Sequence, residues 1–272
     1  MNLELENLDV LITGGSKGIG LACARGFLAE GARVTLVSRT METLLAAQAS
    51  LTTMLMNADP NADATLRINV IAADLRDATE AERAVETIER EFGPVDVLVN
   101  SAGAAKRTPA AELTAASWHD AMQAKFFTYI HVINPLIKKM GERGRGAVVN
   151  VIGSGGKVAA VTHLAGGSAN AALMLASAGF ASAYAGKGVR VNAVNPGLTL
   201  TERLHEGMQA EARHLGISIE EALTRAKATR PLGRIAEPSE IADAVVYLAS
   251  KRASYITGAV VAMDGAVTPM VV

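Results

Sequence analysis

A glycine-rich segment near the start of the chain has the composition of a phosphate-binding turn. It follows a short apolar run and opens a helix-length segment, and it reads Thr13-Gly14-Gly15-Ser16-Lys17-Gly18-Ile19-Gly20. Glycines let the backbone turn sharply and approach a ligand closely, while the N–H groups and positive dipole end at a helix start favour an anion. An ordinary glycine-rich turn would have the same composition. The position between a strand and a helix favours a nucleotide pyrophosphate, with contacts from Gly14, Ser16, Lys17, Gly18, Ile19 and Gly20.

The end of the second apolar run indicates which dinucleotide would bind. An acidic residue about 20 positions after the glycine turn would hold a free ribose 2′-hydroxyl, but the chain has Ser38 and Arg39 there. A guanidinium group can bind phosphate through two parallel hydrogen bonds, and Lys17 supplies a second cation. Each of these cations could instead be an ordinary solvated side chain. Because both are present where an acid is missing, they favour NADP over NAD.

The elements that must position these residues follow from an alternation along the whole chain. Short apolar runs predict seven buried strands, at residues 9–13, 33–37, 66–72, 95–100, 147–152, 190–194 and 259–263. Helix-length segments lie between them, at residues 19–30, 43–57, 79–92, 115–139, 163–185 and 239–250. The alternation predicts an α/β fold: one domain over residues 1–272 with a doubly wound, Rossmann-type parallel sheet and helices on both faces. Residues 200–229 interrupt it, and we expect them to form a flap over a substrate pocket.

Composition excludes several classes of function. A formal net charge of −1 leaves no electrostatic footprint for nucleic acid and no basic face for a membrane. The uncharged stretch at residues 171–186 is shorter than the roughly 20 apolar residues that a bilayer span requires. The single cysteine, Cys23, and the absence of a basic, apolar leader favour a reducing compartment, and we expect a cytoplasmic protein acting on a small molecule. No metal site is predicted.

The order of these motifs resembles the short-chain dehydrogenase/reductase family over nearly the whole chain. The glycine segment is similar to the family's signature, and Arg230-Pro231-Leu232-Gly233-Arg234 and Asp264-Gly265 are also similar to family sequence. The resemblance implies an adenine-contacting pair, a turn after the fourth strand and a loop beside the nicotinamide, contributed by Asp74, Leu75, Asn100, Ala102, Gly103, Pro196, Gly197, Thr199 and Thr201.

The family's catalytic tetrad of Asn, Ser, Tyr and Lys is changed at all four positions when this resemblance is followed residue by residue. It places Gly166 at the tyrosine, Asn170 at the lysine, Gly153 at the serine, with Ser154 next to it, and Lys125 at the asparagine. Hydride transfer to a carbonyl needs a hydrogen-bond donor for the developing negative charge and an acid to neutralise it. The usual acid is therefore missing.

One observation leaves catalysis open. Lys and Asn have exchanged positions, so Lys125 could supply the cation or the proton, with His163, Ser154 and Asn170 completing the donor set. Lys125 could equally be a surface cation and His163 an ordinary residue at a helix start. Tyr129, one helical turn after Lys125, is a remote candidate and is more simply explained as a packed core residue.

Two classes of function follow. The first is an NADP-dependent oxidoreductase with an unconventional acid, acting on a small carbonyl or alcohol. The second is a catalytically inactive dinucleotide-binding protein that acts as a sensor or an oligomer partner. Residues 165–185 are rich in Ala, Gly and Ser, which permits close helix packing, and the family resemblance implies a homodimer or homotetramer. Close packing of this helix on its own sheet would need the same residues.

Overall fold

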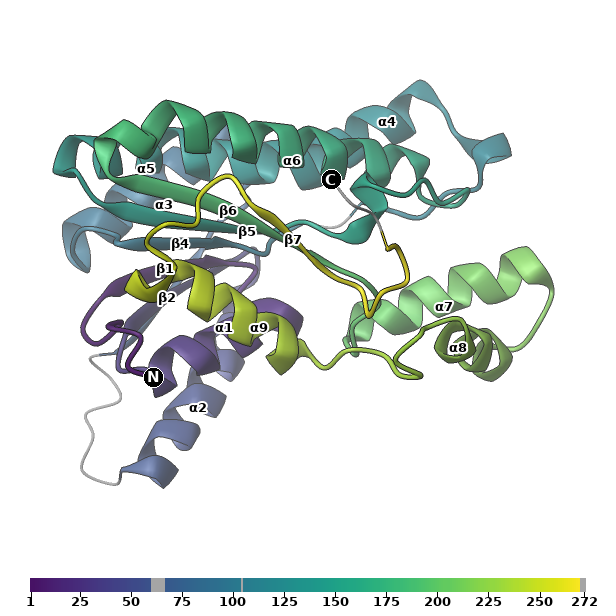
Figure 1. Cartoon of the computed structure of the whole chain (residues 1–272), viewed down its shortest axis with the longest axis horizontal. Coiled ribbons are helices and arrows are strands. Elements are labelled where there is room, and N and C mark those ends of the chain that lie inside the picture. The colour runs from purple at the N-terminus through teal and green to yellow at the C-terminus, as the bar shows by residue number, and fades with distance from the viewer. Residues whose placement is uncertain (60–66, 104, 270–272) are drawn as a thin grey trace.

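A parallel sheet crosses the middle of the molecule, with helices on both faces (Figure 1). The structure, a computed structural model, describes residues 1–59, 67–103 and 105–269. The strands pair in parallel in the order β3-β2-β1-β4-β5-β6-β7. They are β1 (Asp9–Thr13), β2 (Arg33–Ser38), β3 (Ile68–Ala72), β4 (Val97–Asn100), β5 (Gly146–Val151), β6 (Val189–Pro196) and β7 (Val260–Met263). The predicted seven-stranded doubly wound sheet is confirmed, although Leu66, the predicted start of the third strand, lies outside the described residues.

The apolar runs form strands because both faces of the sheet are buried. In β1, Val10 and Ile12 face one hydrophobic cluster and Leu11 faces the other. Successive strand residues point to opposite faces, so a continuous apolar run suits a sheet that is covered on both sides. One cluster packs against α1 (Gly18–Ala29), α2 (Met41–Ala58) and α9 (Pro238–Ala249). The other packs against α3 (Ala78–Glu91), α5 (Thr128–Arg143) and α6 (Leu164–Tyr184), on the opposite face in Figure 1.

The predicted helix at residues 115–139 is divided into three parts. It comprises α4 (Ala115–Ala121), a π-helical segment η3 (Met122–Phe127) and α5. Thr114 caps α4 in a reciprocal arrangement with Ser117, and the Thr128 hydroxyl donates to the Gln123 carbonyl 2.9 Å away. A helix-length segment was predicted there, and the π-helical turn within it was not foreseen because apolar spacing does not report a single wide turn. Such turns are frequent at functional sites, and this one contains Lys125.

The segment between β6 and α9 forms two helices that extend beyond the sheet (Figure 1, light green). They are α7 (Glu202–Leu215) and α8 (Ile219–Ala228), and the Ser218 hydroxyl caps α8 by accepting from the Glu221 N–H. Met208, Ala212 and Ala222 form a small core between them. The predicted flap at 200–229 is therefore a helical pair with its own packing.

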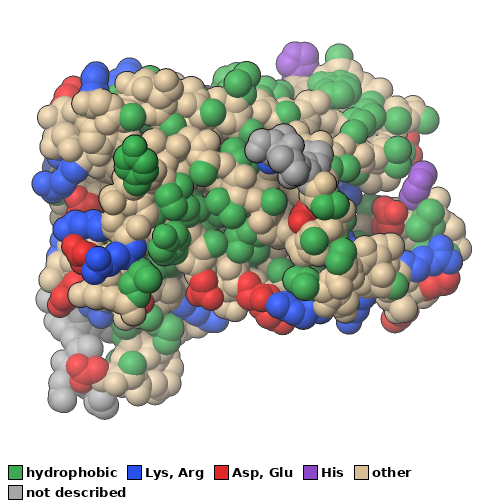
Figure 2. Space-filling view, in the orientation of Figure 1, with side chains coloured by type: hydrophobic (Ala, Val, Ile, Leu, Met, Phe, Trp, Pro, Cys, Tyr) green, Lys and Arg blue, Asp and Glu red, His purple; other side chains and the backbone are tan. Residues whose placement is uncertain are grey.

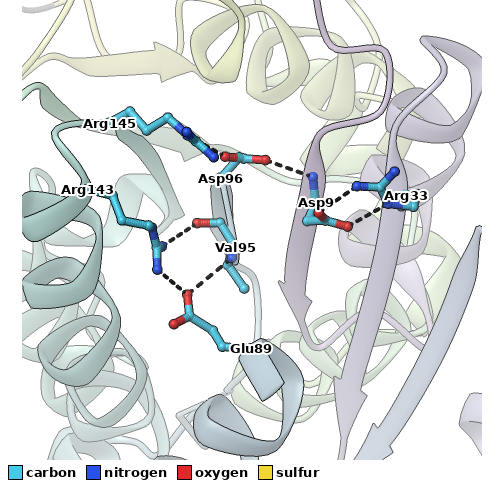
Figure 3. A network of polar contacts seen from close by, with 7 residues as sticks. All are labelled: Asp9, Arg33, Glu89, Val95, Asp96, Arg143 and Arg145. Atoms are coloured by element: carbon cyan, nitrogen blue, oxygen red, sulfur yellow. Dashed lines mark hydrogen bonds and ion pairs between the residues drawn. The ribbon is translucent and has the colours of Figure 1, made fainter. Parts of the chain in front are cut away.

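Ion pairs fix the amino-terminal edge of the sheet (Figure 3). Asp9 at the start of β1 accepts two hydrogen bonds of 2.7 Å from Arg33 at the start of β2. Asp96, just before β4, accepts from the Asp9 N–H at 3.2 Å and from Arg145 at 3.0 Å. Arg143 joins Glu89 to the Val95 carbonyl, at 2.9 and 3.0 Å. The charged side chains at the amino-terminal ends of these strands are therefore paired with one another or with backbone groups.

The helical segment Leu164–Lys187 is long and apolar enough to cross a membrane, by length and composition only, so the exclusion of a span from the length of residues 171–186 was wrong. In the fold, α6 lies along the sheet and buries Leu173, Ser177 and Ala181 against it. Its apolar composition is accounted for by this packing.

Candidate functional site

The predicted site residues gather at the carboxyl-terminal edge of the sheet. The strand order reverses direction between β1 and β4, and in open parallel sheets ligands bind at the carboxyl ends beside that reversal. Strands β1 to β6 each end at a predicted residue or within three positions of one: Gly14, Ser38, Asp74, Asn100, Ser154 and Gly197.

The glycine turn is packed so closely that only glycine fits at two positions. Gly14 has a φ of 67°, and a Cβ atom there would lie 2.8 Å from the Ala102 Cα atom. A Cβ atom on Gly20 would lie 2.3 Å from the Gly14 carbonyl oxygen. The helix α1 begins at Gly18, and Lys17 at its N-cap position makes no capping hydrogen bond through its side chain. The first N–H groups of α1, which have no acceptor within a helix, are therefore oriented toward a ligand at this turn.

A buried hydroxyl lies at the end of β2, where the 2′-position of a dinucleotide is expected. The Ser38 Oγ atom is buried and has no hydrogen-bond partner among the described residues, and Arg39 beside it is exposed. A buried polar atom without a partner costs free energy, so an oxygen-rich ligand here would satisfy it. Lys17 lies elsewhere: its ammonium group forms an exposed ion pair of 2.9 Å with Glu202 in α7. A role of Lys17 in phosphate binding stays a prediction and requires that pair to open.

A second arginine lies close to this end of the site. The Arg76 guanidinium forms a bidentate pair with Asp74, which holds the pKa of that carboxyl below its usual range. Leu75 is buried, and its carbonyl oxygen lies 3.0 Å from the His131 Nδ1 atom. The Asp74 carboxylate is thus already paired, and sequence analysis missed Arg76.

A chain of buried amides connects the glycine turn to α6. The Thr13 hydroxyl donates to Asn100, Asn100 donates to Asn150, and Asn150 donates to Ser177, over 3.2, 3.0 and 2.9 Å. Thr13 also accepts from the Ala102 N–H at 3.3 Å, which fixes the turn after β4. Each buried amide group is therefore satisfied, and the chain sets the spacing between the strands that carry the site.

The loop after β6 closes the other side. Pro196 ends β6, and the Gly197 N–H donates to the Met263 carbonyl at 3.0 Å. The hydroxyls of Thr199 and Thr201 donate to nearby backbone carbonyls, each at 3.4 Å. The Thr201 methyl group lies 3.3 Å from where a Cβ atom on Gly18 would be, so the start of the flap contacts the glycine turn.

Lys125 is buried at the centre of the site. Its ammonium group donates to the Tyr129 hydroxyl at 2.9 Å and to the Val151 carbonyl at 3.1 Å. Burial lowers the pKa of Lys125 to about 7, with a smaller effect from the charge of Arg203. Tyr129 is fully buried, which raises its pKa, and its hydroxyl donates to the same Val151 carbonyl. An ammonium group has three donors, so one remains for a ligand.

His163 and Asn170 meet at the start of α6. A Cβ atom on Gly166 would lie 2.2 Å from the His163 Cε1 atom, so the imidazole fills the place where a side chain at 166 would begin. The Asn170 Nδ2 atom lies 3.2 Å from the corresponding point on Gly153. Burial first, then the charges of Arg107, Arg203 and Lys125, lower the pKa of His163 to about 4. The ring is therefore neutral at pH 7.

Ser154 lies between two glycines that contact this pair. A Cβ atom on Gly155 would lie 3.0 Å from the His163 Cδ2 atom and 3.7 Å from the Asn170 Nδ2 atom. Ser154 opens the short helix η4 (Ser154–Gly156) and lines a small pocket of about 20 Å³ with Lys157, Asn195, Ala262, Asp264 and Thr268.

Comparison with known proteins identifies the family. A family model described as enoyl-(acyl carrier protein) reductase matches residues 14–268. D-threitol dehydrogenase from Mycolicibacterium smegmatis is 32% identical over 98% of this chain and 95% of its own length. The chain belongs to the short-chain dehydrogenase/reductase family.

Two solved structures of similar proteins hold a coenzyme. L-sorbose reductase from Gluconobacter frateurii, in complex with NADPH and L-sorbose, has a TM-score of 0.89 and 28% identity, with all of both chains covered. A short-chain oxidoreductase from Pseudomonas aeruginosa PAO1, described as NADPH-bound with an atypical catalytic center, has a TM-score of 0.84 and 30% identity and covers 98% of this chain and 100% of its own. The predicted fold and family are thus confirmed for this short-chain dehydrogenase/reductase.

Two further cations near the catalytic end were missed by sequence analysis. Arg203 donates to the carbonyls of Gly103 and Ala105, at 3.4 and 3.1 Å, and Arg107 donates to the Thr162 hydroxyl at 3.4 Å. No short motif signals them, since the contact between Arg203 and Gly103 joins residues 100 positions apart.

Proposed function

We propose that this short-chain dehydrogenase/reductase is an NADP(H)-dependent oxidoreductase that interconverts a small carbonyl compound and its alcohol. The glycine turn, the α1 N-terminus and the orphaned Ser38 hydroxyl fit a phosphorylated dinucleotide, with Arg39 placed to pair with its 2′-phosphate. When bound, the nicotinamide supplies or accepts the hydride. NADPH in two similar structures supports the choice of coenzyme.

Lys125 is proposed as the group that gives the proton to the substrate oxygen. Reduction adds a hydride to the carbonyl carbon and a proton to the oxygen, so the acid must be charged near working pH and hydrogen-bonded in place. Lys125 meets both needs, since its pKa is about 7 and Tyr129 and Val151 fix two of its three donors. This geometry is the observation that carries the proposal. Tyr129 is fully buried and acts as a positioning residue.

The remaining donors are neutral. His163 holds the space above Gly166, and its Nδ1 atom is buried without a partner among the described residues. A neutral imidazole can donate one N–H hydrogen bond to a substrate oxygen, but at pH 7 it does not carry the second, acidic proton that could be transferred. Asn170 supplies an amide, and Ser154 faces the adjoining pocket. Relative to the family's Asn, Ser, Tyr and Lys, the proposed set therefore exchanges Lys with Asn and replaces the phenol by a buried ammonium.

A second candidate function is coenzyme binding without turnover. One observation favours it. Tyr129, the one tyrosine near Lys125 in the described part of the chain, is fully buried, so no phenol is exposed to a substrate there. A sensor or oligomer partner would need the coenzyme cradle but not an acid.

A direct assay separates the two. Coenzyme binding is measured by calorimetry, and consumption of NADPH is measured against a panel of ketones that includes L-sorbose, with D-threitol tested in the oxidative direction. Turnover of any panel member above the rate without protein supports the oxidoreductase. Binding with no turnover in either direction would support the second candidate, and absence of binding would contradict both.

The helical pair of α7 and α8 is proposed to act as the substrate flap, since Arg203 joins it to the turn after β4.

Self-association and a cytoplasmic location complete the proposal. β7 is an edge strand, and Figure 2 shows hydrophobic side chains gathered on this side of the molecule. Val261 in β7 and Tyr255 in the segment before it are exposed. Leu175 on α6 is also exposed. Light scattering tests the expected dimer or tetramer, and Val261→Asp should shift the mass downward if β7 contributes.

A further inference from the structure

Two guanidinium groups beside the catalytic end have only neutral partners. Arg203 donates to two backbone carbonyls, and Arg107 donates to the Thr162 hydroxyl. Within the described part of the chain, neither forms an ion pair with a carboxylate. Other arginines of this chain are paired in a bidentate way with acids, as Arg33 is with Asp9. The pair near the site is therefore left with free donors.

The two guanidinium groups are neighbours, one from α7 and one from the segment at residues 105–108, and the charge of Arg107 acts on Arg203. Arg203 and Gly207 are one helical turn apart on one face of α7. The Arg107 Nε atom lies 3.5 Å from where a Cβ atom on Gly207 would be. The two arginines therefore lie close together, Arg203 on α7 and Arg107 on the segment at residues 105–108.

The two arginines lie next to the proposed catalytic groups Lys125 and His163. The Thr108 N–H donates to the Thr162 carbonyl at 2.9 Å, which places Arg107 beside the residue that precedes His163. The charges of Arg107 and Arg203 both lower the pKa of His163, and that of Arg203 lowers the pKa of Lys125.

The acids that face this cluster are too far away to neutralise it. Glu206 acts on Arg203, and Glu211 acts on Arg107, through longer-range attraction only. The nearest acid on the flap's first turn, Glu202, is paired with Lys17. Several cations held together without an acid repel one another, so a bound anion would stabilise the arrangement.

We infer that the substrate of this enzyme carries an oxyanion, in its simplest form a carboxylate, which Arg107 and Arg203 bind together while Lys125 meets the reacting oxygen. The inference rests on the proposed oxidoreductase function and narrows its substrate class to oxo and hydroxy acids.

The test compares matched acids and amides on the protein saturated with NADP⁺. Short oxo acids, including 4-oxocyclohexanecarboxylate, and their neutral amides are titrated by calorimetry. We expect each bound acid to be held about 10- to 100-fold more tightly than its amide, the range of a charge-assisted contact. Arg107→Gln and Arg203→Gln should each remove most of this preference, and Arg203→Lys should retain part of it. Arg213→Gln, an exposed change farther along α7, is the matched control and should leave the preference intact.

Three outcomes would overturn the inference: acids and amides bound equally, no acid bound at all, or the same loss in Arg213→Gln as in Arg203→Gln. Coenzyme affinity and the unfolding temperature of each variant show whether the fold is retained. A turnover assay keeps the two proposals distinct. Reduction of neutral ketones with no advantage for acids would reject only the inference, whereas acid binding without any turnover would reject the oxidoreductase and leave the anion site.

Discussion

The imidazole of His163 occupies the space in which a side chain at Gly166 would begin. A Cβ atom on Gly166 would lie 2.2 Å from the His163 Cε1 atom, closer than two such atoms can approach. A side chain at position 166 is therefore excluded as long as the His163 ring keeps this place, so we expect the effects of changes at the two positions to be coupled.

Gly166→Ala should destabilise the protein by about 1–3 kcal/mol, the usual cost of overpacking a filled site. The double variant His163→Ala with Gly166→Ala should recover most of that loss, because the ring that the new methyl group meets is gone. Urea denaturation of the single and double variants measures the coupling. Gly179→Ala in the same helix is the control: nothing lies within 4 Å of its Cβ position, so it should be neutral or stabilising by about 0.4–1 kcal/mol. Additive effects of His163 and Gly166 would contradict the contact.

Lys125→Met should reduce carbonyl turnover by about 10²- to 10⁴-fold, the contribution of general acid catalysis, without weakening coenzyme binding. Lys138→Met, an exposed change on α5, should leave turnover unchanged. Steady-state kinetics and calorimetry on both variants give the comparison. Unchanged turnover in Lys125→Met would exclude this residue as the acid.

The pH dependence follows from the same residue. Because the pKa of Lys125 is lowered to about 7, the fraction of charged acid, and with it the reductive rate, should fall as pH rises through about 7. Stability should change in the opposite direction. The unfolded chain keeps the proton up to the ordinary lysine pKa of about 10.5, so between these values the unfolded state binds more protons and the free energy of unfolding rises with pH. Lys125→Met should remove that rise, and denaturation at several pH values measures it.

Arg39→Ala should weaken NADPH binding about 10- to 100-fold and leave NADH binding nearly unchanged, since only NADPH carries the 2′-phosphate. Fluorescence titration with both coenzymes gives the ratio. Arg25→Ala, an exposed change in α1, is the matched control. Equal loss for both coenzymes would place Arg39 outside the 2′-phosphate site.

Arg143→Met should cost about 1–3 kcal/mol, because it removes the partly buried guanidinium that joins Glu89 to the Val95 carbonyl (Figure 3). Glu89 would keep Lys139 at 3.5 Å and the Val95 N–H at 3.1 Å. The exposed pair of Arg90 with Glu91 offers the contrast, and Arg90→Met should change stability by less than about 0.5 kcal/mol. Coenzyme affinity should be unchanged in both, as the network lies at the edge remote from the site. A cost for Arg143→Met as small as that for Arg90→Met would show that the network does not stabilise the sheet.

Sequence reasoning predicted the sheet well and the catalytic end incompletely, for one physical reason. Strands such as β1 are encoded locally, in a run of buried apolar residues, and the glycine turn is encoded in the residues that follow it. The ion pair of Lys17 with Glu202 joins residues 185 positions apart, and no local pattern announces it. The same holds for the closeness of Arg107 and Arg203. The burial that sets the pKa of His163 is likewise a property of the assembled site, so its neutral state could not be read from the chain.

The wide turn at η3 makes the position of Lys125 sensitive to chain length as well as to residue type. A π-helical turn holds one residue more than an α-helical one, and the loss of a single residue restores the regular spiral. Removal of the exposed Phe127 would rotate Lys125 by about 100° around the axis relative to α5, away from Tyr129 and Val151. A relative of this protein could therefore lose its buried ammonium through a one-codon deletion while every other residue of the site stayed the same.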